Sequence, residues 1–330
     1  MPGFIIAATI ILGLAAGGTR LLRGRPHEIQ RLVLLTGMIT TLLLPVVMEL
    51  TAVMGLSALV SSCGAPGPGR LLPGGNIQSL FAAVWLGGAV LLGARLCWHV
   101  ILALRMARRS RAMDDDEVSA VARALDLPRR EVARRFRICA GIETPLVLAG
   151  LRQIVLLPAA WPRWPAGLQS SALRHEWQHV RTADAQWAVP AALLRVVLWF
   201  HPLAWWVCAR WAEQCEHLAD RAAASGRAAG DYARDLLSLA ARAHTGAPAF
   251  ATAFIPRTRT RLERRIRAVL DDSARSLPCG RIQRLLVLLV FAAAGLSLAA
   301  LLARPKDSTP ADLLGEARTR LAANPFPADP

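Results

Sequence analysis

The sequence predicts a mainly α-helical, multi-pass membrane protein with a cytoplasmic α+β domain that carries a small β-hairpin. Three observations lead to this fold class. The chain of 330 residues is 54% hydrophobic and contains long runs without any charged side chain. Its net charge of +16 comes almost entirely from arginines, many of which lie near the ends of those runs. The long stretch between the last two runs has a mixed composition and is large enough for a domain of its own.

Four apolar runs qualify as membrane-spanning helices. They lie at residues 3–18, 32–48, 78–93 and 285–303. Each approaches the roughly 20 residues that a helix needs to cross the hydrocarbon core of a bilayer. We therefore predict three spans with short loops in residues 1–103 and a fourth span at residues 284–304.

The charges of the connecting loops predict one orientation. Arginines are frequent after the first and third runs, whereas the Gly- and Pro-rich loop after the second run holds only Arg70. Because arginine and lysine concentrate in cytoplasmic loops, residues 104–283 should form a cytoplasmic domain attached to the bacterial inner membrane. The fourth span then carries the chain outward and leaves residues 305–330 as a short extracytoplasmic tail.

The arginine content also raises the alternative of a nucleic-acid-binding protein. Such a protein needs a basic soluble face with aromatic side chains that stack on bases. Here the arginines crowd the ends of the spans, where anionic lipid attracts them, and the tryptophans gather in the apolar stretch 185–211. The sequence therefore predicts the lipid bilayer as a partner and no direct contact with nucleic acid.

Within the predicted cytoplasmic domain, the pattern changes along the chain. An acidic run near residue 114 precedes two short helices that are broken at Pro128, and two β-rich apolar runs flank Gly150 in residues 144–158, which predicts a hairpin. From Gly167 onward the pattern is helical. The apolar stretch at about 185–211 predicts a helical hairpin that is broken near His201 and packs at or dips into the membrane surface.

The stretch LRHEWQHVRTAD contains the candidate chemistry. Residues i and i+4 lie on the same face of a helix, so His175 and His179 can direct two imidazole nitrogens at one metal ion. Glu176 can then take a proton from water at that ion. The alternative is a polar helix face without a metal, because the five-residue pattern alone also arises by chance.

A second stretch, EHLAD, supplies a third candidate ligand. A catalytic zinc site has three protein ligands and one open position, and Glu216 can provide the third ligand. Asp220, one turn later, can accept a hydrogen bond from a ligand histidine and fix its tautomer. The alternative for this pair is a solvated helix face. His201 is a further candidate, as a group that stabilises an oxyanion; a packed core or turn histidine is the alternative.

Together, LRHEWQHVRTAD, WFHPLAWW and CEHLADRAA resemble the membrane metallopeptidases of the beta-lactam-sensor antirepressor type, the Bla and Mec regulator family. TPLVLAGLRQIVLLP resembles the segment before the zinc helix of that family. The resemblance implies a gluzincin-like zinc endopeptidase domain with one Zn²⁺ per chain. It also implies that His175, His179 and Glu216 are the zinc ligands, that Glu176 is the catalytic residue and that Asp220 lies in the second shell.

The resemblance also implies a regulatory protease whose substrate is a cytoplasmic protein such as a DNA-binding repressor, and we expect a homodimer as a further partner. The sensors of that family carry an outer domain with a serine three residues before a lysine. In this chain Ala303 lies three residues before the single lysine, Lys306, so we expect no penicillin-binding sensor domain. A quality-control or processing metalloprotease and a non-catalytic signalling scaffold are the alternatives.

Overall fold

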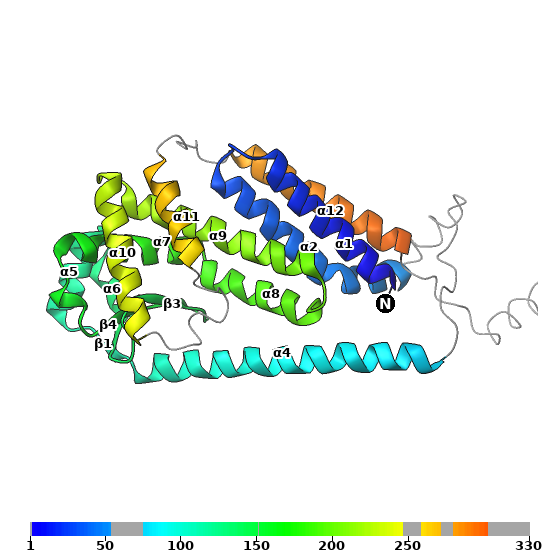
Figure 1. Cartoon of the computed structure of the whole chain (residues 1–330), viewed down its shortest axis with the longest axis horizontal. Coiled ribbons are helices and arrows are strands. Elements are labelled where there is room, and N and C mark those ends of the chain that lie inside the picture. Colours follow the sequence, from blue (N-terminus) through cyan, green and yellow to red (C-terminus); the bar gives the residue numbers. More distant parts are fainter. Residues whose placement is uncertain (1, 54–74, 151, 247–258, 272–279, 303–330) are drawn as a thin grey trace, which may run out of the picture.

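The computed structural model describes residues 2–53, 75–150, 152–246, 259–271 and 280–302. Most of these residues are helical, and a small sheet lies at one end of the molecule (Figure 1). The loop between the second and third predicted spans and the predicted tail at 305–330 lie outside the described residues.

All four predicted spans are helices. They are α1 (Pro2–Leu21), α2 (His27–Val53), α4 (Gly75–Arg109) and α12 (Arg281–Leu302). By length and composition, each is long and apolar enough to cross a membrane. All four begin before the apolar runs, and α1, α2 and α4 also continue past the ends of their runs, where α1 and α4 include arginines. The chain is therefore a membrane protein.

Small residues bring α1, α2 and α12 into close contact. A Cβ at Gly37 of α2 would meet Ala15 of α1 and Phe291 of α12, and a Cβ at Gly295 of α12 would meet Thr40 of α2. Lipid tails are as apolar as the helices, so close backbone packing of this kind drives association inside a bilayer. The three helices lie side by side in Figure 1, and α4 lies apart from them.

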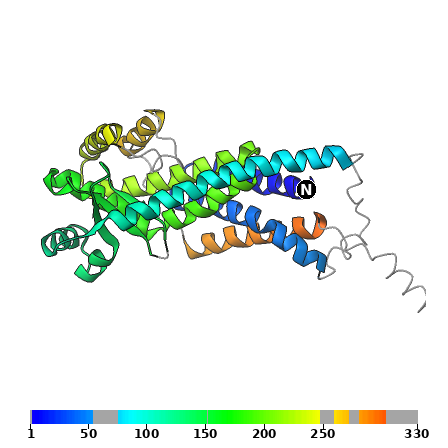
Figure 2. The same ribbon diagram turned by 90° about the horizontal axis from the view of Figure 1, so that it is seen from below.

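Between these three helices and α4 lies a helical hairpin, formed by α8 (Asp184–Val197) and α9 (Pro202–Ala224) (Figure 1). In the view from below, α4 runs across the hairpin (Figure 2). Its two helices separate at residues 198–201, where the sequence predicts the break. The tip is held by indole groups, since Trp85 of α4 donates to the carbonyl of Val197 at 2.9 Å and Trp199 donates to the carbonyl of Trp85 at 3.1 Å.

The position of the hairpin at the membrane surface stays a prediction. In the structure the hairpin packs along the spans, where Leu194, Leu198 and Val207 share a buried cluster with Leu34 and Met38 of α2. Its second helix also continues past residue 211 to Ala224, because nothing between these positions interrupts the helix. One helix thus runs from the interior of the bundle to the candidate ligand at position 216.

The remaining part of the chain contains a four-stranded sheet in the order β1-β2-β4-β3. The predicted hairpin is β3 (Leu146–Leu148) and β4 (Ile154–Pro158), which pair antiparallel with Val147 opposite Val155. The sequence analysis missed β1 (Arg111–Ala112) and β2 (Phe136–Cys139). β2 is parallel to β4 and antiparallel to β1, and β3 occupies an edge of the sheet.

Helix α7 (Ala166–Arg181) packs against this sheet through a core that includes Phe136, Val155, Leu157 and Leu173. The helices broken at Pro128 are α5 (Asp115–Leu125) and α6 (Arg129–Arg135), as the sequence predicts. Two further helices, α10 (Ala229–Gly246) and α11 (Arg259–Leu270), contact the C-terminal half of α9. α7 and α9 therefore cross where their polar residues meet.

Candidate metal centre

Helix α7 presents His175 and His179 on one face. The opposite side of the helix contributes Leu173 and Val180 to the core on the sheet, which fixes the rotation of α7 about its axis. Both imidazole rings are largely shielded from solvent, and their Nε2 atoms lie 3.2 Å apart. Two nitrogens so close together, without another acceptor between them, are suited to share one metal ion.

Helix α9 adds Glu216 to the pair. Its Oε2 lies 3.7 Å from Nε2 of His175, and its Oε1 lies 3.9 Å from Nε2 of His179. One ligand atom from each of the three residues lies within 4.8 Å of the others. Two imidazole nitrogens and one carboxylate oxygen are the ligand set of a catalytic zinc, which keeps a fourth position open for water or substrate. The donor set therefore fits a zinc ion.

The hydrogen-bond partners of the two Nδ1 atoms also fit a metal site. Nδ1 of His175 lies 3.2 Å from Oδ1 of Asp220 and 3.3 Å from the hydroxyl of Tyr232. Nδ1 of His179 lies 2.8 Å from Oδ2 of Asp184. Metal-binding histidines commonly donate their second nitrogen to a carboxylate, which leaves the other nitrogen free for the metal.

Glu176 lies next to His175 on α7 and is half-buried. Its side chain lines the same cavity as His175, His179 and Glu216. A carboxylate that shares a cavity with metal ligands is a candidate general base, because it could exchange a proton with a water at the metal.

Arg265 of α11 is a residue that the sequence analysis missed. Its Nη1 lies 2.9 Å from Oε2 of Glu216, and its Nε and Nη2 donate to the two carboxylate oxygens of Asp220 at 2.8 and 2.6 Å. A single guanidinium thus fixes a candidate ligand and the residue that orients another ligand. The sequence offers no signal for this role, because α11 contains several arginines.

Comparison with known proteins agrees with this geometry. A family model for the BlaR1 peptidase, M56, matches residues 69–269, which is more than half of the chain and includes both α7 and α9. The chain belongs to the BlaR1 peptidase M56 family. No curated protein matches the chain. As a member of the M56 family, the protein is a membrane metallopeptidase, and its substrates are peptides or proteins.

Charges at the M56 site alter the pKa values of its residues. Burial opposes ionisation of Asp220 and Glu216, but Arg265 and the nearby histidines outweigh burial and hold the pKa of both carboxyls below their usual values. Burial also opposes protonation of His179, but Asp184, Glu216 and Glu176 outweigh it and raise the pKa of His179 to about 9. The metal-free site therefore holds ionised carboxylates beside a protonated imidazole and a guanidinium.

The M56 site opens into a cavity of about 940 Å³. One wall is the edge strand β3 with Leu146 and Val147, and another is formed by α10 and α11. The cavity also reaches Arg20 and Arg23 at the C-terminal end of α1. The metal site thus lies where the peptidase domain meets the ends of the membrane-spanning helices.

His201 lies away from this site, and the role of oxyanion stabiliser does not fit its position. It is the residue before α9, fifteen residues before Glu216, which corresponds to about 22 Å of helix. Its ring is buried, and Nε2 lies 2.9 Å from the hydroxyl of Thr9 on α1. His201 therefore acts in packing, because the tip of the hairpin lies inside the helix bundle.

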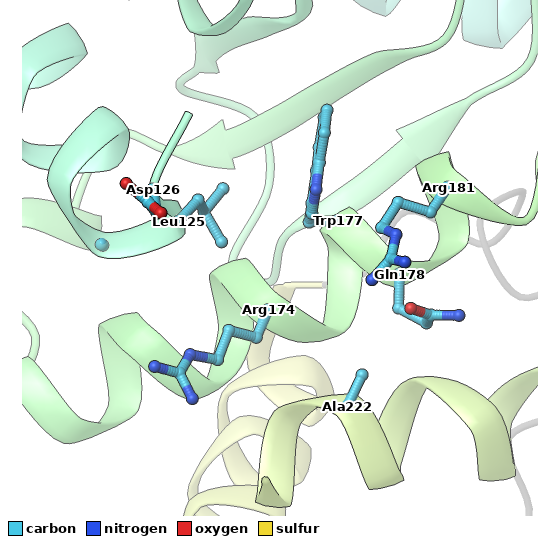
Figure 3. Close-up of a pocket in the computed structure, with 8 residues that line it drawn as sticks. Leu125, Asp126, Arg174, Trp177, Gln178, Arg181 and Ala222 are labelled. Atoms are coloured by element: carbon cyan, nitrogen blue, oxygen red, sulfur yellow. The ribbon is translucent and has the colours of Figure 1, made fainter. Parts of the chain in front are cut away.

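The reverse side of α7 carries a smaller pocket of about 230 Å³. Figure 3 shows that Arg174, Trp177, Gln178 and Arg181 project from α7 toward this pocket. These positions lie on another face of the helix than His175 and His179, so the small pocket is separate from the metal site.

Proposed function

We propose that the protein is an integral membrane zinc endopeptidase with a regulatory role, which cleaves a cytoplasmic protein such as a transcriptional repressor. The observation that carries this proposal is the convergence of two histidines, one glutamate as candidate ligand and Glu176 in a cavity along a sheet edge. When bound, zinc supplies a Lewis acid that polarises the scissile carbonyl and lowers the pKa of water.

Each residue of the site has a separate role. His175, His179 and Glu216 hold the metal, and Asp220 and Asp184 orient the two imidazole rings. Glu176 accepts a proton from the attacking water on its carboxylate and then delivers the proton to the nitrogen of the leaving amine. These are the same residues that the sequence analysis selects, with Asp184 in addition.

The edge strand β3 supports cleavage within an extended chain. Only one side of β3 pairs with β4, and Leu146 and Val147 line the cavity that holds the metal ligands. An extended substrate can add to such an edge by main-chain hydrogen bonds. We infer that the scissile segment binds along β3 as an additional strand and that a folded substrate must expose such a segment.

The arginines of the span ends support a cytoplasmic location for the peptidase domain, residues 104–283. Arg20 at the end of α1, Arg109 at the end of α4 and Arg281 at the start of α12 all lie at helix ends that connect to the peptidase side of the molecule. The positive-inside rule places these ends in the cytoplasm. A soluble DNA-binding repressor would then have access to the cavity. The expected homodimer stays a prediction from the sequence.

The test is zinc content together with proteolysis, for the wild type and for Glu176→Ala, in detergent-purified protein. We expect one zinc per chain in both proteins and cleavage of casein or of the chain itself by the wild type alone. If the wild type binds no zinc, the non-catalytic scaffold replaces the proposal. If Glu176→Ala cleaves as fast as the wild type, another residue is the base.

A further inference from the structure

One arginine of the membrane-spanning helices contacts residues that adjoin the metal ligands. Arg31 lies in the first turns of α2, in the arginine-rich segment that follows the first apolar run. In the structure its side chain is only 13% exposed and points into the peptidase domain. By contrast, Arg23 and Arg25 in the preceding turn region are exposed. Arg31 also lies outside the residues 69–269 that the family model matches.

The guanidinium of Arg31 joins three segments that surround the metal site. Its Nη2 donates to the carbonyl of Thr182, which ends α7, at 2.7 Å, and it also forms an ion pair with Asp184. Its Nε lies 3.3 Å from the sulfur of Cys215, the residue before Glu216. One side chain of α2 therefore contacts the end of the helix that carries both histidines and the residue beside the third ligand.

Asp184 connects Arg31 to a metal ligand. Its Oδ1 pairs with Arg31, whereas its Oδ2 accepts hydrogen bonds from Nδ1 of His179 and from the hydroxyl of Thr182, both at 2.8 Å. The turn that brings Asp184 back to His179 depends on Ala183, which has a φ of 56°. The carboxylate is buried, so its orientation is set by these partners and not by water.

From these contacts, we propose that Arg31 is a positioning residue of the metal centre. Through Asp184 it holds the imidazole of His179 in the orientation that directs Nε2 toward the metal. Without Arg31, the buried carboxylate of Asp184 loses its charged partner, and Asp184 can rotate or attract the metal itself. The metal site of this peptidase is then completed by a membrane-spanning helix, and the proposal rests on the proposed function.

The test uses the full chain in detergent, stripped of metal and reloaded with Zn²⁺ or Co²⁺. Zinc affinity is measured by competition with a chelator, and the Co²⁺ absorption bands report the ligand geometry. We expect Arg31→Gln to weaken zinc binding by about 10- to 100-fold and to change the Co²⁺ spectrum. Arg25→Gln, which alters an exposed arginine nearby, should match the wild type. Unchanged affinity and an unchanged spectrum in Arg31→Gln would overturn the proposal.

A double-mutant cycle separates positioning from a general effect on folding. If Arg31 acts through Asp184, then Arg31→Gln should cause no further loss of zinc affinity in an Asp184→Asn background. Additive losses would show that Arg31 acts by another route, against the proposal. If Arg31→Gln does not fold, Arg31→Lys takes its place in the cycle, because lysine keeps the charge but cannot make all three contacts.

Failure of the proposed function is recognised separately. It shows as a wild type that binds no zinc or does not cleave, whereas failure of the role of Arg31 shows only in the comparison of variants.

Discussion

At the scale of single residues, the metal centre depends on side chains that do not touch the metal. Asp220 accepts from His175 and pairs with Arg265, and the hydroxyl of Tyr232 donates to Asp220 at 2.8 Å. Asp184 has the same role for His179. Each imidazole is thus fixed by its own carboxylate, and each carboxylate is fixed in turn by its own arginine.

We expect Asp220→Asn to weaken zinc binding by about 10- to 100-fold, because the ring of His175 loses a charged acceptor. Chelator competition measures the change. Asp235→Asn is the matched control, because Asp235 pairs with Arg227 at 2.5 Å and accepts from Ser171, neither of which is a candidate ligand. Equal affinities for the two variants would contradict the role given to Asp220.

The raised pKa of His179 predicts the pH dependence of metal binding. With a pKa of about 9, its imidazole is protonated in the metal-free protein at neutral pH and must lose that proton to bind metal. Zinc affinity should therefore rise about tenfold per pH unit up to pH ~9. The stability of the metal-free fold depends on pH in the opposite direction. Protonated His179 stabilises the fold fully below pH ~6.5, and this stabilisation is lost as the pH rises through 9.

Isothermal titration in buffers of different ionisation enthalpy measures the protons released on zinc binding. We expect about one proton per zinc at pH 7 and a smaller number above pH 9. No proton release at pH 7 would show that His179 is already neutral in the metal-free protein.

The candidate ligands could be predicted from sequence because their spacing is local. His175 and His179 lie on the same helix face however the rest of the chain folds. The downstream pair Glu216 and Asp220 is also one helical turn apart. Arg265 and Arg31 could not be predicted. Their roles depend on how α11 and α2 pack against the domain, and both lie among other arginines with the same local pattern.

At the scale of elements, the hairpin α8–α9 connects the membrane-spanning helices with the peptidase domain. Composition predicts the four spans well, because few structures other than membrane-spanning helices contain apolar runs of that length. Composition does not predict β1 and β2, since they are short and pair with strands that are distant in sequence. The path of the hairpin along the spans also depends on tertiary contacts, which no local pattern records.

The contact of α4 with the hairpin can be tested at two adjacent glycines. A Cβ at Gly88 would overlap the indole of Trp199, whereas a Cβ at Gly87 would meet nothing within 4 Å. We expect Gly88→Ala to destabilise the protein by about 1–3 kcal/mol through overpacking. Gly87→Ala should be neutral or slightly stabilising. Thermal unfolding in detergent measures both, and equal midpoints would show that α4 does not pack on Trp199.

At the scale of the whole molecule, α4 predicts how the protein lies in the membrane. It has 35 residues, or about 50 Å of helix, which exceeds the roughly 30 Å of a bilayer core. Its arginine-rich C-terminal end leads directly into the sheet. The excess length of α4 therefore extends from the bilayer toward the peptidase domain.

Labelling of introduced cysteines tests this orientation. A cysteine in place of Asp116, which is exposed in α5, should react with a membrane-impermeant maleimide only after the inner membrane is opened. A cysteine in place of Ser79, which is exposed near the opposite end of α4, should react in intact cells. Labelling above that of the parent chain is measured in each case, and the reverse pattern would invert the proposed topology.

The shared core of the hairpin and the spans limits how the enzyme can be dissected. A fragment that starts at residue 104 would keep all three candidate ligands but would expose Leu194, Leu198 and Val207, which α2 now covers. An apolar surface of that kind promotes aggregation in water. Such a fragment would also lack Arg31. A split form, in which residues 2–53 are supplied as a separate polypeptide, would restore both the apolar cover and the arginine, so reassembly of the two pieces can be followed by recovery of metal binding.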